Sequence, residues 1–249
     1  MYAQAVKSVS VPTQSILFNI DIEGPLTKDK TAVLRVFAKM FYNHCGFYGD
    51  DLKIAKLERF IEKQGKTQQF REAFEKVNGA PWTETRDSFA FFEDDIVSVL
   101  QSTLGMSEQA ARNWFNGEET NELSRAQLVS EFQEYLDGNG KDYRLLVMVD
   151  EVGQYIGDDG DLMINLQSLV EDIGIRCHGK VWFMVTSQEA IDSVVHITGN
   201  DFSKIQGRFN TLLSLSSSSV DEVIKKRVLA KTDAADQHLR MVYDKDHAV

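Results

Sequence analysis

The stretch that decides the fold is RLLVMVDE, residues 144–151. An uninterrupted apolar run, residues 145–149, is followed directly by two carboxylates, Asp150 and Glu151. A strand that is buried on both faces has such a run, and open α/β sheets bind ligands just beyond the carboxyl ends of these strands. Acidic residues at that position can hold a nucleotide's Mg²⁺ and orient an attacking water. The residues alone leave a second interpretation open, a core strand followed by a solvated acidic turn.

In P-loop NTPases, a strand that is followed by such acidic residues is called the Walker B strand. It is usually accompanied by a phosphate-binding loop, GxxxxGK followed by Ser or Thr. The sequence contains no such motif. The nearest match is Gly65-Lys66-Thr67, but Phe60 stands where the first glycine belongs. The residues before it have the charge and spacing of a helix, so we interpret Gly65 as the stop between two helices.

Length and composition indicate an ordinary globular protein. A chain of 249 residues, 43% hydrophobic and 26% charged, can bury a sizeable core as one large or two small domains. The net charge of -11 argues against broad, non-specific binding to nucleic acid, which needs clustered Lys and Arg. The two cysteines lie far apart, which argues against a disulfide framework. With no signal peptide and no apolar run of membrane-spanning length, we expect a cytoplasmic protein.

Two pairs of neighbours, His44-Cys45 and Cys177-His178, raise the question of zinc. Adjacent side chains diverge by about 100° on a helix and point to opposite faces of a strand. Bringing all four to one tetrahedral site would need an unusual backbone. We therefore expect buried cysteines beside surface histidines.

Apolar periodicity predicts two patterns along the chain. Residues 15–21 are typical of a strand that ends in Asp21, with a turn at Gly24 and Pro25. Helices are then predicted at residues 30–44, 52–63, 68–77, 81–104, 107–115 and 124–136. From Arg144 the pattern alternates, with strands at residues 144–149, 180–186 and 211–215 and helices at 162–173, 190–194, 202–208 and 220–230. The tail from Thr232 is polar, and we expect it to fray.

Strands that alternate with helices predict parallel βαβ units. About 120 residues of helix between the first two strands are far more than a crossover needs. The expected fold is therefore α/β, a parallel sheet with a large helical insertion. Its predicted parts are a first core strand in residues 1–28, the insertion in 29–140, the rest of the core in 141–231 and the tail in 232–249.

Polar residues follow the predicted strand ends in a suggestive order. Asp150 and Glu151 follow one predicted strand, and Thr186, Ser187 and Gln188 stand at the end of the next. The segment after that strand carries Lys204 and Arg208. In P-loop ATPases of the AAA+ type, acids serve Mg²⁺ and water, a polar residue on the next strand senses the γ-phosphate, and a later arginine stabilises transition-state charge. Spacing alone favours Arg208 as a surface arginine after Gly207.

Several segments resemble one family, the P-loop ATPases of the BREX phage-resistance system (the BrxC/PglY family). They are LVMVDEVGQYIGDD (146–159), NLQ (165–167), VTSQE (185–189), KIQGRF (204–209), SLSS (214–217) and VDEVI (220–224). ILFNID (16–21) looks like the strand that follows the P-loop in that family. The resemblance spans nearly the whole chain. It implies an incomplete P-loop NTPase core of the AAA+/ASCE type, from a large cytoplasmic ATPase that acts with partners to block phage.

The resemblance also implies roles for individual residues. Asp150 would bind Mg²⁺ and Glu151 would be the catalytic base. Thr186, Ser187 and Gln188 would sense the γ-phosphate of ATP, and Arg208 would be an arginine finger. Leu212 stands where we expect a second arginine. We expect the chain to begin after the family's P-loop, so that alone it binds ATP weakly or not at all and hydrolyses none.

The partners implied are other BREX components including a DNA methyltransferase, and further copies of the full-length protein. DNA would be contacted only indirectly, and no membrane is involved. Two alternatives come from other classes. One is a non-catalytic interaction module in a defence complex, with residues 30–136 as its working part. The other is a metal-dependent hydrolase that uses Asp21, Asp150 and Glu151, although no histidine joins them at ligand spacing.

Overall fold

The computed structural model describes residues 10–25, 27–116, 122–157, 159–187 and 230–246, with the single residues 211, 213 and 224. The chain divides into two compact units, Met1–Arg208 and Phe209–Val249. The first unit contains, in order, β1 (Thr13–Asn19), α2 (Ile20–Glu23), α3 (Ala32–His44), α4 (Leu52–Lys63), α5 (Thr67–Asn78), α6 (Trp82–Thr85), η1 (Arg86–Phe91), α7 (Glu93–Leu104), α8 (Glu108–Asn116), α9 (Arg125–Gly138), β2 (Arg144–Asp150), α10 (Val152–Ile156), α11 (Gly160–Arg176) and β3 (Val181–Val185). In the second unit the structure describes one helix, α15 (Asp233–Asp246).

The three described strands form a parallel sheet in the order β1-β2-β3. One face of this sheet is buried in a single apolar cluster with side chains from α3, α9, α10 and α11. The strands contribute these buried residues to it: Ile16, Phe18, Leu145, Val147, Val149 and Val181. The predicted α/β fold with parallel strands is therefore confirmed, and the first strand was placed correctly to within two residues.

The opposite face of the sheet is open among the residues that the structure describes. Leu17 is 67% exposed, Trp182 58% and Met184 53%. Leu17 and Met184 are the neighbours of Met148 on the two adjacent strands, so these side chains share one face of the sheet. The topology explains this asymmetry. Because the chain crosses from β1 to β2 to β3 in one direction, right-handed crossovers put every connecting helix on the same face.

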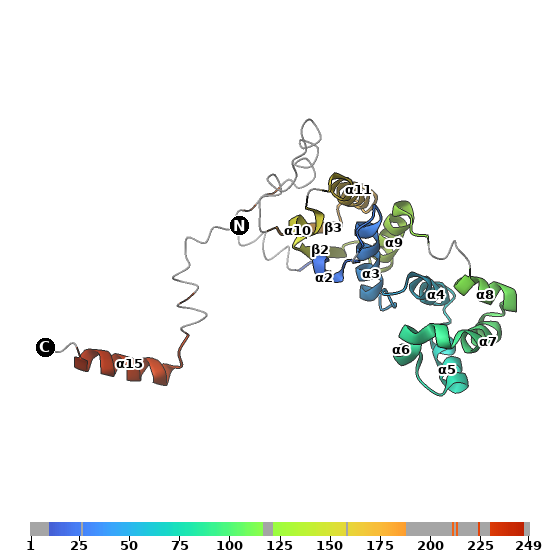
Figure 1. The fold of residues 1–249 in the computed structure, drawn as a ribbon, viewed down its shortest axis with the longest axis horizontal. Helices are drawn as coiled ribbons and strands as arrows, with labels where there is room; N and C mark the ends of the chain where they lie inside the picture. The colour runs from blue at the N-terminus through green and yellow to red at the C-terminus, as the bar shows by residue number, and fades with distance from the viewer. Residues whose placement is uncertain are drawn as a thin grey trace. The chain divides into compact units, whose positions relative to one another are not determined.

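Helices α4 to α8 form a second apolar cluster of their own, and we call residues 52–116 the helical module (Figure 1). At its centre, Trp82 packs edge-to-face against Phe70 and Phe74, with ring centroids 5.3 and 5.0 Å apart. The described part of the predicted insertion consists of helices and the turns between them, and α3 and α9 at its two ends belong to the layer that covers the sheet.

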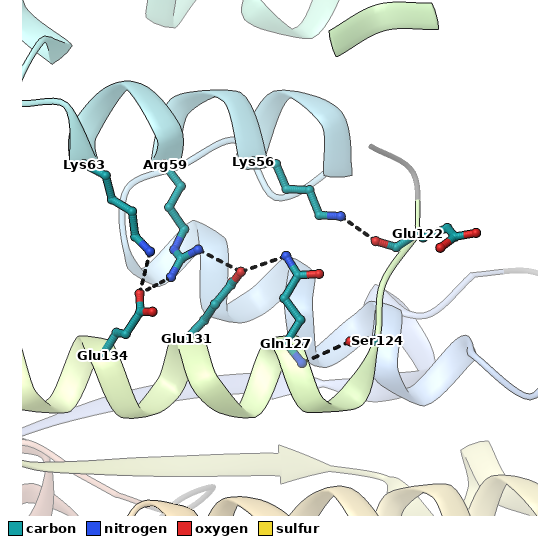
Figure 2. A network of polar contacts seen from close by, with 8 residues as sticks. All are labelled: Lys56, Arg59, Lys63, Glu122, Ser124, Gln127, Glu131 and Glu134. Carbon is teal, nitrogen blue, oxygen red and sulfur yellow. Dashed lines mark hydrogen bonds and ion pairs between the residues drawn. The ribbon is translucent and has the colours of Figure 1, made fainter. Parts of the chain in front are cut away.

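Ala55 and Leu52 of α4 reach into the apolar cluster of that layer, and polar side chains of α4 and α9 surround this contact (Figure 2). Arg59 donates hydrogen bonds to Glu131, at 2.8 Å, and to Glu134. Nζ of Lys63 lies 2.7 Å from Oε2 of Glu134, the oxygen that also accepts from Arg59. Gln127 donates to Glu131 at 3.2 Å. The Glu131 side chain is only 3% exposed, so this is a largely buried ion pair at the joint between the two regions.

Three predictions about secondary structure need correction. The helix expected at 81–104 is broken into α6, η1 and α7, because Ser88 and Phe92 leave helical backbone angles. The first strand ends at Asn19, so Asp21 lies in the single-turn helix α2 instead of on the strand. The polar tail contains a helix, α15. The elements predicted at 190–194, 202–208, 211–215 and 220–230 fall outside the described residues, except for isolated positions.

The two cysteines are free thiols in the structure. Cys177 is buried beside an exposed His178, as predicted, whereas Cys45 is only half-buried. Burial raises the pKa of the Cys45 thiol to about 12 and that of Cys177 to about 11. Among the described helices, none is both long and apolar enough to cross a membrane.

Candidate functional site

Polar side chains from all three strands meet at the carboxyl edge of the sheet. The register sets Asn19, the last residue of β1, directly beside Asp150, the last residue of β2. Glu151 follows Asp150, and Thr186 follows the last residue of β3. The structure thus brings together three of the residues that the sequence singled out, Asp150, Glu151 and Thr186, because parallel strands end at a common edge.

Asp150 is fixed by the residue that follows β3. The Thr186 hydroxyl donates to Oδ1 of Asp150, and the backbone N–H of Glu151 lies 3.2 Å from the same hydroxyl oxygen and 3.1 Å from that carboxylate oxygen. The backbone of Thr186 continues the sheet beyond β3, since its N–H donates to Val149 at 3.0 Å and its carbonyl accepts from Val152 at 3.0 Å. An exposed carboxylate is therefore held in one orientation at the rim.

Glu151 is held by a residue that the sequence did not single out, Asn19. The Nδ2 of Asn19 donates to Oε2 of Glu151 at 2.6 Å. Its Oδ1 accepts from the N–H groups of Asp21 and Ile22, at 2.9 and 3.2 Å, and so caps α2. Because these two donors require the amide oxygen on their side, the amide nitrogen must face Glu151. The available signal was an Asn before a short acidic turn, a common helix cap.

The backbone at Glu151 is unusual. Its φ of 61° lies in the left-handed region, which non-glycine residues seldom occupy. This conformation turns the chain sharply from β2 into α10. Such a residue costs roughly 1–3 kcal/mol, and residues of this kind cluster at functional sites. The contacts of Asn19 and Thr186 help to hold it there.

Asp21 does not join the acids of the edge. It pairs with Lys28 at 3.9 Å, and Lys28 donates to the carbonyl of Tyr155 at 2.8 Å. Within the described ranges, no group of three or more His, Cys, Asp or Glu side chains is arranged to hold a metal ion. The metal-dependent hydrolase built on Asp21, Asp150 and Glu151 is therefore wrong in its geometry. A Mg²⁺ that arrives with a nucleotide needs only one or two carboxylates, since phosphates and waters supply the rest.

The remaining predicted site residues are only partly described. Ser187 is half-buried, and its hydroxyl has no hydrogen-bond partner among the residues that the structure covers. Gln188, Lys204, Arg208 and Leu212 lie outside those residues. The predicted arginine finger and the amide of the sensor segment therefore stay predictions.

No model of a known protein family and no solved structure matches this chain. What the coordinates define is the class: an α/β protein with a parallel sheet, one face of it covered by helices, and an acidic, hydrogen-bonded carboxyl edge.

Proposed function

We propose that this chain is part of a P-loop ATPase of the BREX phage-resistance type and supplies its Walker B and sensor residues. The observation that carries the proposal is the edge itself. Asp150 ends β2 and Glu151 follows it. Thr186, just after β3, holds Asp150, and Asn19, at the end of β1, holds Glu151. Ligands of open α/β sheets bind at this place.

Each residue of the edge has a chemical role in this proposal. Asp150, oriented by Thr186, would bind the Mg²⁺ of ATP. Glu151 would take a proton from the attacking water, and Asn19 would position it. Thr186, with Ser187 and Gln188, would sense the γ-phosphate. The roles of Gln188 and of Arg208, together with the partners, a DNA methyltransferase and other BREX components, rest on the resemblance of the sequence alone.

The open face of the sheet supports a further part of the proposal. Among the described strands, β3 pairs only with β2. A strand beside β3 whose chain continued to β1 would cross the sheet in the opposite direction. Its right-handed crossover would then cover the face that carries Leu17, Trp182 and Met184. A glycine-rich loop between that strand and its helix would lie beside Thr186, where backbone N–H groups can hold phosphates.

The test begins with the coding region upstream of Met1. We expect it to encode a strand followed by GxxxxGK and Ser or Thr. The longer product should hydrolyse ATP, and Glu151→Gln should lower kcat by about 10²–10⁴-fold, the usual worth of a general base. Glu72→Gln, a carboxylate on α5 hydrogen-bonded to Gln68, is the matched control and should leave kcat unchanged. Turnover by the 249-residue chain alone, lost on Glu151→Gln, would contradict the need for that loop.

A non-catalytic interaction module is the second candidate, and one observation favours it: the helical module has an apolar cluster of its own. A phage-challenge assay separates the two. If the chain acts as an ATPase, Glu151→Gln abolishes protection. If it acts only as an interaction module, protection survives Glu151→Gln and is lost when the surface of the helical module is changed.

A further inference from the structure

We propose that Lys39 couples the helical module to Glu151, so that a partner which moves the module changes how Glu151 is held. Lys39 is a positioning residue in this proposal, not a catalytic one. That Glu151 performs chemistry rests on the proposed function; the coupling itself rests only on the contacts described next.

Lys39 bridges two carboxylates from different parts of the chain. Its Nζ lies 2.8 Å from Oε2 of Glu23, at the end of α2, and 2.8 Å from Oδ1 of Asp50, just before α4. Burial acts to lower the pKa of Lys39, but its hydrogen bonds to Asp50 and Glu23 outweigh this and the pKa is raised. The ammonium therefore stays charged and binds both carboxylates at once.

On the module side, the two neighbours of Asp50 are fixed, Gly49 to α3 and Asp51 to α4. A Cβ on Gly49 would lie 2.2 Å from the carbonyl oxygen of Lys39, so the loop rests directly on α3. The N–H of Gly49 also donates to the side chain of Asn43 at 2.8 Å. Asp51 caps α4 by accepting from Lys53 and Ile54 at 2.9 and 3.1 Å. A displacement of α4 must therefore move Asp50 or break these contacts.

On the site side, the path from Glu23 to Glu151 is short. Glu23 is the last residue of α2, a single turn closed by the hydrogen bond from Gly24 N–H to Ile20, at 2.9 Å. Gly24 lies so close to Tyr155 of α10 that a Cβ there would be 2.6 Å from the ring. Asn19 caps the other end of this turn and holds Glu151. Glu23 and Asn19 are thus joined by a single turn of helix, through which a shift of Glu23 reaches Asn19.

The experiment follows the side-chain amide signals of Asn19 by NMR in the ¹⁵N-labelled 249-residue chain. We expect Lys39→Met and Asp50→Asn to have the same effect on these signals, either a shift in the same direction or a broadening in both variants. Asp50→Asn should have no further effect in the Lys39→Met background, because the connection is already broken. Lys39→Arg, which can still bridge both carboxylates, should restore most of the original signal. A general loss of stability would not be reversed in this residue-specific way.

Arg35→Met is the matched control. Arg35 lies one turn earlier on α3 and pairs with Asp29, at 2.6 Å, without contacting the module. It should leave the Asn19 signals in place. Unchanged Asn19 signals in Lys39→Met, or equal changes in Arg35→Met, would overturn the coupling.

The outcomes also separate this proposal from the ATPase proposal. If Asn19 responds to Lys39→Met but the longer product fails to hydrolyse ATP, the coupling stands and the ATPase function fails. If the longer product hydrolyses ATP while the Asn19 signals do not change in Lys39→Met or Asp50→Asn, the ATPase function stands and the coupling fails.

Discussion

One glutamate is buried inside the helical module, and another is buried at the joint between the module and the sheet layer. The two differ in how their carboxylate oxygens are hydrogen-bonded. Glu58, inside the module, accepts hydrogen bonds from Trp82 at 2.6 Å, from the Tyr48 N–H at 2.5 Å and from Arg86 at 3.0 Å. Glu131, at the joint, has partners on Oε1, but its Oε2 has no hydrogen-bond partner within the part of the chain that the structure describes.

A second buried group, the hydroxyl of Tyr42, lies beside Glu131 at the joint. Burial, followed by the charge of Glu131 and a hydrogen bond to it, raises the pKa of this tyrosine. By geometry, however, neither this hydroxyl nor Oε2 of Glu131 makes a hydrogen bond of normal length and angle to a described residue. A buried polar group without a partner costs about 1–3 kcal/mol. The two glutamates therefore differ, but the module is not complete in its hydrogen bonds, since Arg71 Nε on α5 also lacks a partner among the described residues. The ion pairs of Arg59 and Lys63 make the joint the place where the two regions can separate, as polar interfaces within one chain often allow.

The largest effects should come from breaking each apolar cluster in turn. Phe74→Ala removes a ring from the module's centre, and Phe41→Ala removes one that stacks on Phe132 at 4.0 Å under the sheet. Each should cost about 3–5 kcal/mol in the free energy of unfolding. Hydrogen exchange read residue by residue should show Phe74→Ala lowering protection in α4 to α8 while α3 and α9 keep theirs. An equal loss everywhere would mean that the two clusters form one cooperative core.

The next effect should come from the joint. Arg59→Met leaves Glu131 buried without its cation, which should cost about 2–3 kcal/mol, less than for a fully buried pair because Arg59 is partly exposed. Replacing Glu131 by Met as well should recover most of this loss in urea unfolding. Lys63→Met, which removes a half-exposed partner of Glu134, is the control and should change little. If Lys63→Met costs as much as Arg59→Met, burial is not what makes this joint matter.

Sequence patterns predicted the parts of this comparison that depend on local periodicity. The strand before Asp150 and the meeting of Asp150 with Thr186 follow from an apolar run and from parallel pairing. Asn19 was missed because its role depends on a one-turn helix and on a carboxylate 132 positions away. The sequence did not single out Lys39, since only the fold brings Glu23 and Asp50 to it. Nothing in the periodicity marked the end of helical backbone at Ser88.

Asn19 allows a sharper test at the edge of the sheet, with a smaller expected effect. Asn19→Ala removes the cap of α2 and should cost about 1 kcal/mol in the free energy of unfolding. Asn19→Asp keeps an acceptor for the Asp21 and Ile22 N–H groups but sets a second carboxylate against Glu151. Its cost should therefore grow at neutral pH and shrink in acid, where one of the two carboxylates is protonated. Equal costs for both variants across pH would show that the contact with Glu151 does not matter for stability.

The smallest effect concerns His44, at the end of α3 on the sheet side of the joint. Burial lowers its pKa below the ordinary value of 6.5, and its Nε2 lies 2.9 Å from the hydroxyl of Tyr135. Because the unfolded chain then binds a proton more readily than the folded one, this histidine's contribution is complete above pH 6.5 and is lost as the pH falls through and below it. Urea unfolding from pH 8 to 5 should show this decline, and His44→Gln should flatten it. Phe74→Ala should leave it intact, since the decline belongs to the sheet layer, and its disappearance in that variant would mean that the module controls the burial of His44.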